Sequence, residues 1–114
     1  MMKSDCLFCK IIKKEVLSEI VSENKLALAF KDINPQAPDH ILIIPKAHIA
    51  STIDINRENS QYLIEMVLLA NEISKNTNED GYRWVVNTGK HGGQTVYHLH
   101  LHLLSGRQFH WPPG

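Results

Sequence analysis

The chain has 114 residues and a mass of 13.0 kDa, which predicts a single domain over residues 1–114 and excludes a barrel joined to a separate cofactor domain. Its 12 basic and 12 acidic residues cancel, so no net field attracts nucleic acid or an anionic membrane. No apolar stretch follows the first charged residues, and the longest apolar runs fall far below the ~18 residues of a membrane span. We therefore expect a cytoplasmic protein whose partners include neither nucleic acid nor membrane.

The first half of the chain predicts one short helix and three strands. Residues 6–14 have apolar residues at helical spacing. Short strands are expected at 19–22 and 26–30, and two prolines indicate a loop over 32–38. The apolar run at 41–44 predicts an interior strand that is covered on both faces.

The second half predicts a long helix followed by two strands. Apolar residues recur at helical spacing between 57 and 76, and 82–87 is rich in β-forming residues. A glycine loop is expected at 89–93 and a strand at 96–104. With short turns between strands, this order indicates an α+β fold in which a helix packs on one antiparallel sheet.

The strongest chemical signal is a row of histidines in the last predicted strand. Five of the seven histidines follow position 90, and His98, His100 and His102 alternate with leucines. Alternate side chains of a strand lie on one face, so the three imidazoles are expected to form a row. Neutral imidazoles in a row suit an anion or a metal. A half-buried strand that exposes its histidines, or uses them in a structural metal site, stays open as the alternative.

The segment before this strand suits a phosphate group. Gly92 and Gly93 allow backbone N–H groups to approach an anion, and Gln94 and Thr95 add neutral donors. An imidazole nitrogen of the following strand could then attack phosphorus while its neighbours hold the other oxygens.

These segments resemble a known family. The sequence His98-Leu99-His100-Leu101-His102-Leu103-Leu104 resembles the motif of the histidine triad (HIT) superfamily. Further segments resemble, in the same order, its histidine triad nucleotide-binding (Hint) branch: 32–38, 44–49, 82–87, 92–97 and 106–114. The resemblance implies the HIT-like fold, an antiparallel five-stranded sheet with one long helix and a short N-terminal helix.

The resemblance also implies an activity. A purine nucleoside phosphoramidase or nucleotidyl hydrolase would release AMP or GMP from an amine or acyl group through a covalent nucleotidyl-histidine on His100. The alternative from a different class is a nucleotide-binding regulatory or interaction module with incidental turnover. A third hypothesis, a plain zinc-binding protein, treats all the histidines as ligands.

The family pattern assigns roles to individual residues. His98, His100, His102 and Thr95 would form the catalytic set. The implied nucleotide-binding set comprises Leu7, Phe8, Ile11, Phe30, Asp32, Ile33, Asn87, Gly93, Gln94, Thr95, Val96, His100, His102 and Trp111. In that set Asp32 accepts from the ribose hydroxyls. Most of the apolar members would line the base, and core packing is the alternative explanation for them.

The resemblance implies no catalytic cofactor but allows a structural zinc ion. Cys6 and Cys9 have C-x-x-C spacing, and the matching ligands would be His48 and His98. A reduced, packed cysteine pair is the alternative. A thioredoxin-like redox role is not expected, because the motif does not follow a βαβ pattern.

The resemblance further implies a homodimer. The tail that contains Trp111 would cross the interface and contact the other subunit's site, while the helix at 57–76 and the strand at 82–87 complete the contact. The remaining histidines, His40, His91 and His110, are expected on the surface or in loops.

Overall fold

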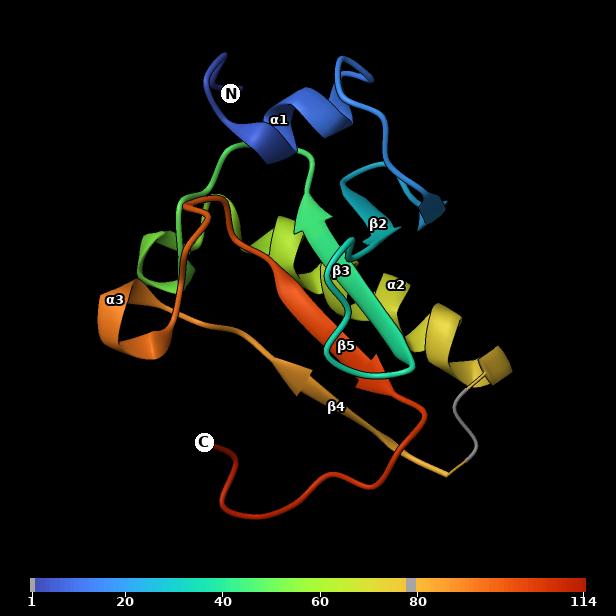
Figure 1. The fold of residues 1–114 in the computed structure, drawn as a ribbon. Coiled ribbons are helices and arrows are strands. Elements are labelled where there is room, and N and C mark those ends of the chain that lie inside the picture. Colours follow the sequence, from blue (N-terminus) through green and yellow to red (C-terminus); the bar gives the residue numbers. More distant parts are fainter. Residues whose placement is uncertain (1, 78–79) are drawn as a thin grey trace.

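The structure, a computed structural model, describes residues 2–77 and 80–114. Its elements are, in chain order, α1 (Leu7–Ile12), β1 (Ile20–Glu23), β2 (Ala27–Lys31), β3 (Asp39–Pro45), the 3-10 helix η1 (Thr52–Asp54), α2 (Ser60–Thr77), β4 (Tyr82–Val85), α3 (Gly89–Gly92) and β5 (Leu101–Ser105). Figure 1 shows the sheet in the middle of the molecule, with α1 near the end of β3.

The five strands form one sheet in the order β1-β2-β3-β5-β4, and every neighbouring pair is antiparallel. This confirms the predicted α+β fold with a five-stranded antiparallel sheet. The central strand β3 pairs with β5 so that Leu42 lies opposite His102. Residues paired in this way share a face of the sheet, so the register decides which side chains of β3 meet the histidine row.

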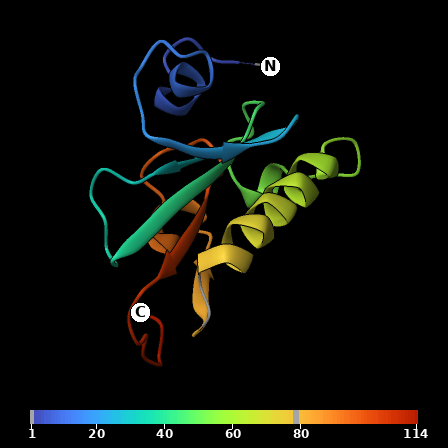
Figure 2. The same ribbon diagram turned by 90° about the vertical axis from the view of Figure 1, so that its right-hand side faces the viewer.

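The two faces of the sheet bury different sets of side chains. Figure 2 shows α2 on one side of the sheet. The side chains buried on that side form a cluster: Ala27, Ala29, Ile43, Ile49, Met66, Leu69, Ala70, Leu99, Leu101 and Leu103. The opposite face packs Phe8, Ile11, Leu28, Phe30, Leu42 and Ile44. Because β3 contributes to both clusters, its covering on both faces is confirmed, as predicted for 41–44.

Two segments near the histidine row differ from expectation. Strand β5 starts at Leu101 instead of residue 96, because the backbone N–H of Leu99 donates to the carbonyl of Ile49 at 2.7 Å, outside the ladder. The predicted glycine loop contains the single-turn helix α3, which is capped by Gly93 with a left-handed φ of 89°. Only glycine adopts this conformation without strain, which explains why this residue follows the turn.

In the part of the chain that the structure describes, no helix has both the length and the apolar character that crossing a membrane requires.

Candidate active site and metal cluster

A cavity of about 400 Å³ opens on the face of the sheet opposite α2. Its lining combines apolar side chains of α1 and the strands with polar groups of the 32–36 loop and β5: Leu7, Phe8, Ile11, Val16, Leu17, Ser18, Phe30, Lys31, Asp32, Ile33, Asn34, Gln36, His40, Leu42, Thr95, Val96, His100 and His102. A larger hollow of about 720 Å³ lies against α2, but its lining contains no histidine or cysteine. Because the histidines line the smaller cavity, it is the candidate active site.

His100 is buried at the cavity and held in one tautomer. Its Nδ1 atom lies 2.7 Å from the backbone oxygen of His98, which can only accept a hydrogen bond, so Nδ1 carries the hydrogen. In the neutral ring, Nε2 then carries the lone pair. The ring of Phe8 packs edge-on against His100 with centroids 5.2 Å apart. A fixed imidazole with a free lone pair beside a cavity is the arrangement of a nitrogen nucleophile.

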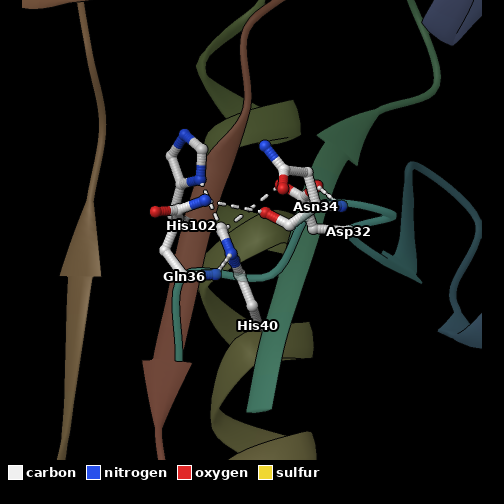
Figure 3. Close-up of polar contacts among 5 residues, drawn as sticks. All are labelled: Asp32, Asn34, Gln36, His40 and His102. Atoms are coloured by element: carbon white, nitrogen blue, oxygen red, sulfur yellow. Dashed lines mark hydrogen bonds and ion pairs between the residues drawn. The ribbon is translucent and has the colours of Figure 1, made fainter. Parts of the chain in front are cut away.

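His102 lies next to His100 but carries its hydrogen on the other ring nitrogen. The ring centroids of His100 and His102 are 5.0 Å apart. Nδ1 of His102 lies 2.9 Å from Nε2 of His40, while the N–H of Gln36 donates to Nδ1 of His40 at 3.0 Å (Figure 3). Because His40 accepts at Nδ1, it donates from Nε2, and His102 then carries its hydrogen on Nε2.

The Nε2–H group of His102 is a hydrogen-bond donor that has no acceptor among the described residues, and it is buried. Burial lowers the pKa of His102 to about 4 and also lowers the pKa of His40, so both rings are neutral near pH 7. A buried, unpartnered donor beside a nucleophile is the group expected to meet an oxygen of a bound anion.

His40 is the functional residue that the sequence prediction placed wrongly. It was expected on the surface or in a loop, but only 6% of it is exposed, and Oδ2 of Asp32 lies 3.4 Å from its Nε2. The signal was present in the sequence: His40, Leu42 and Ile44 alternate along a strand, so His40 shares the face of two core residues.

Beside the cavity, two cysteines and two histidines gather within metal-binding range. The ligand atoms of Cys6, Cys9, His48 and His98 all lie within 4.8 Å of one another. Sγ of Cys6 is 3.3 Å from Nδ1 of His98, and Sγ of Cys9 is 3.5 Å from Nδ1 of His48. A set of two thiols and two imidazoles is a common donor set for structural zinc.

The orientation of His98 fits metal binding. Its Nε2 lies 3.0 Å from the carbonyl oxygen of Pro45 and therefore carries the hydrogen, which leaves a lone pair on the Nδ1 that faces the cysteines. Burial lowers the pKa of His98 to about 4, so the ring is neutral, as a metal ligand must be. The His98 side chain is fully buried and does not line the cavity.

Four predicted nucleotide-binding residues lie away from the cavity lining. Gln94 is buried, and its amide nitrogen donates to the carbonyls of Ala50 and Val96 at 2.8 and 3.1 Å, while its oxygen accepts from the N–H of Gly89. The hydrogen bonds of this side chain therefore stabilise the loop, and the side chain does not line the cavity. The other three residues outside the lining are Asn87, Gly93 and Trp111.

The remaining predicted nucleotide-binding residues do line the cavity. Thr95 and Val96 line it together with His100, and Asp32 lies next to His40. Ile33 also lines the cavity although 97% of it is exposed, so it projects from the loop at the mouth.

Comparison with known proteins places this arrangement in a family. A family model described as "Scavenger mRNA decapping enzyme C-term binding" matches residues 5–110. The crystal structure of a HIT family hydrolase from Legionella pneumophila matches with a TM-score of 0.92 and 51% identity, covering 96% of this chain and 100% of that chain.

Two curated relatives are nearly as similar in sequence. The purine nucleoside phosphoramidase of Escherichia coli is 48% identical over 93% of this chain and 91% of its own length. A 14 kDa zinc-binding protein of Zea mays is 48% identical over 97% of this chain and 89% of its own length. The fold and the histidine row thus define a histidine triad protein. The chain belongs to the HIT family, as its sequence motifs predicted.

Proposed function

We propose that this protein hydrolyses the P–N bond of purine nucleoside phosphoramidates, and the P–O bond to the acyl group in related acyl adenylates, with His100 as the nucleophile. The observation that carries the proposal is the fixed tautomer of His100, whose Nδ1 is bound to the backbone oxygen of His98 at 2.7 Å. The Escherichia coli relative of this chain is a purine nucleoside phosphoramidase, which supports this choice of substrate.

The reaction proceeds in two displacements. In the first, Nε2 of His100 bonds to the α-phosphorus, the P–N bond of the substrate breaks, and the amine takes up a proton from solvent as it leaves. In the second, water attacks the same phosphorus and gives up a proton to solvent, the bond to His100 breaks, and the nucleoside monophosphate is released. Dividing one difficult displacement into two easier ones is the advantage of a covalent intermediate.

His102 stabilises the charge that develops on the phosphate oxygens. Its buried Nε2–H has no partner among the described residues, so a phosphate oxygen supplies the missing acceptor. Thr95, which lines the cavity, adds a hydroxyl donor. The Gly93 and Gln94 backbone and the Asn87 amide complete this environment from outside the cavity lining.

The cavity suits a nucleoside. Its volume of about 400 Å³ lies within the ordinary range of small-molecule sites. Asp32 accepts from the ribose hydroxyls, as a fixed carboxylate does in other nucleotide sites. The base lies against the apolar side chains of Leu7, Phe8, Ile11, Phe30, Ile33 and Val96.

The cluster of Cys6, Cys9, His48 and His98 holds a structural zinc ion. The chemistry of these four donors supports this, since they lie within 4.8 Å of one another and His98 presents a lone pair to the thiols. When bound, zinc supplies a cross-link between α1 and the segments that carry the two histidines. No step of the reaction requires it.

The protein acts as a homodimer. The edge strand β4 and the adjacent side of α2 expose large apolar side chains, among them Leu68, Tyr82 and Trp84. Trp111 is 81% exposed, which suits a tail that contacts the other subunit's site. Sedimentation analysis of the wild type and of a Trp84→Glu variant tests this. A monomeric wild type overturns the proposal.

The catalytic proposal is tested with an adenosine phosphoramidate as substrate. Steady-state release of the amine is compared among wild type, His100→Ala and His100→Gly, with the exposed His91→Ala as the matched control. We expect turnover to disappear in both His100 variants, while AMP binding, measured by calorimetry, is retained. Mass spectrometry of protein denatured during turnover detects the nucleotidyl adduct on His100.

Equal turnover by wild type and His100→Ala would overturn the assignment of the nucleophile. AMP binding by a wild type that shows no turnover and no adduct would instead identify a nucleotide-binding module.

A further inference from the structure

The turn after β5 braces the loop that precedes β3. Gly106 has a left-handed φ of 99°, and a Cβ atom built on it would lie 2.8 Å from Cβ of Pro38. Next to it, an Nη2 hydrogen of Arg107 is donated to the carbonyl oxygen of Gln36 at 3.1 Å. Two neighbouring residues of this turn therefore contact the same loop, one by close packing and one by a hydrogen bond.

Gln36 is held at both of its backbone groups. Its carbonyl accepts from Arg107, and its N–H donates to Nδ1 of His40 at 3.0 Å. A residue bound at both ends has little freedom to rotate either peptide group. The guanidinium of Arg107 thus helps to fix the direction of an N–H group inside the active site, although Arg107 itself does not line the cavity.

The N–H of Gln36 determines the tautomers of two imidazoles, His40 and His102. While it donates to His40 Nδ1, His40 carries its hydrogen on Nε2 and donates to His102 Nδ1, 2.9 Å away. His102 then presents a hydrogen on Nε2. Without the donor from Gln36, His40 can carry its hydrogen on Nδ1 and accept from His102. His102 would then present the lone pair of its Nε2 atom to the phosphate. This lone pair would repel the lone pairs of the phosphate oxygens.

One other group favours the same tautomer. Oδ2 of Asp32 lies 3.4 Å from Nε2 of His40 and attracts the hydrogen on that atom. Loss of the Gln36 contact therefore weakens the preference without abolishing it. This limits the expected effect to a partial loss of the productive tautomer.

We infer that Arg107 is a positioning residue for the reaction, which acts through Gln36 and His40 to keep a hydrogen on Nε2 of His102. The inference rests on the proposed function for its kinetic consequence. Its structural consequence, the tautomer of His102, can be observed without substrate.

The chain offers a matched control in Arg83. Both guanidinium groups stack on the ring of Phe109, at 4.3 Å for Arg107 and 5.3 Å for Arg83. Both also donate to a backbone carbonyl of the tail, Arg83 to His110 and Arg107 to Gln108, but of the two only Arg107 also donates to Gln36 among the described residues. Loss of Arg83 therefore disturbs the tail and leaves the Gln36 contact in place.

The experiment compares Arg107→Met, Arg107→Lys and Arg83→Met with wild type. Methionine keeps an apolar contact with Phe109 and removes the donor, and lysine keeps one donor. Long-range ¹H–¹⁵N spectra of the imidazole rings report the tautomers of His40 and His102. Steady-state kinetics with an adenosine phosphoramidate separate kcat from KM.

For Arg107→Met we expect a mixture of His102 tautomers and a kcat about tenfold below wild type, with KM changed by less than about twofold. Arg83→Met should keep the wild-type His102 tautomer, and Arg107→Lys should recover most of the wild-type tautomer and kcat. An unchanged His102 tautomer in Arg107→Met overturns the inference, as does the same mixture of His102 tautomers in Arg83→Met. If wild type itself does not turn over, the proposed function fails, while the spectra still decide the positioning role.

Discussion

The Nε2 atom of His40 lies 2.9 Å from Nδ1 of His102, so two rings from adjacent strands share one hydrogen. The register of β3 and β5 places both rings on the same face, and the N–H of Gln36 sets the direction of the hydrogen bond. His40 is therefore part of the candidate active site, although it lies outside the histidine row.

Replacing His40 by phenylalanine keeps an aromatic ring and removes the hydrogen bond to His102. Since His102 then loses the partner that fixes its tautomer, we expect kcat for phosphoramidate hydrolysis to fall about 10- to 100-fold. The exposed His91→Phe substitution serves as the control and should leave kcat unchanged. A His40→Phe enzyme with wild-type kcat would show that the contact has no catalytic effect.

Loss of one ligand from the cysteine–histidine cluster should release the metal. We expect about one zinc ion per chain in wild type and none in His48→Asn, because a tetrahedral site closes only with all of its donors. The melting temperature should fall by about 5 °C or more as the cross-link to α1 disappears. Elemental analysis and calorimetry measure both quantities.

The control for this prediction is His110→Asn, which changes a histidine of the exposed tail. It should retain both the zinc content and the melting temperature. Equal zinc content in wild type and His48→Asn would contradict the assigned ligand set.

The leucines that alternate with the histidine row should contribute to stability. Leu101 is 2% exposed and packs in the cluster beneath α2, so Leu101→Ala should lower the free energy of unfolding by about 2–5 kcal/mol. Leu17, which is 96% exposed, is the matched control, and Leu17→Ala should change it by less than about 0.5 kcal/mol. Urea unfolding measures both values, and similar losses in the two variants would contradict this view of the core.

The stability of the protein should depend on pH through His102. Burial lowers the pKa of His102 from 6.5 to about 4, so between these values the unfolded chain binds more protons than the native protein. The free energy of unfolding therefore rises with pH in this window. The contribution of His102 is complete above about pH 6.5 and is lost as the pH falls toward about 4.

Urea unfolding of the chelator-treated protein at several pH values measures this dependence. His102→Asn should show a shallower rise, with a difference of about 1–2 kcal/mol across the window after allowance for solvent screening. Identical slopes in the two proteins would contradict the lowered pKa.

Much of the fold could be predicted because its elements have strong periodic patterns. The alternation of leucine and histidine from residue 98 onward placed the two sets of side chains on opposite faces, although the ladder itself begins only at Leu101. The turn of helix at 89–92 escaped prediction because two glycines lower helix propensity. The Gln94 side chain stabilises it instead, since it accepts from the N–H of Gly89 and donates to the carbonyl of Ala50.

The candidate site was harder to predict where a side chain depends on distant partners. Gln94 looked like a phosphate donor because it follows two glycines, but its side-chain amide is bound by the nearby backbone of Gly89 and Val96 and by the distant carbonyl of Ala50. The Cys6, Cys9, His48 and His98 cluster could be suggested only by resemblance. Its members lie up to 92 positions apart, and only the fold brings them together.

His98 performs two separable tasks with two parts of one residue. Its ring faces the cysteines, while its main-chain oxygen orients the neighbouring imidazole. Every amino acid supplies that main-chain oxygen, so replacing His98 removes one donor of the cysteine–histidine cluster and leaves the acceptor for Nδ1 of His100 in place.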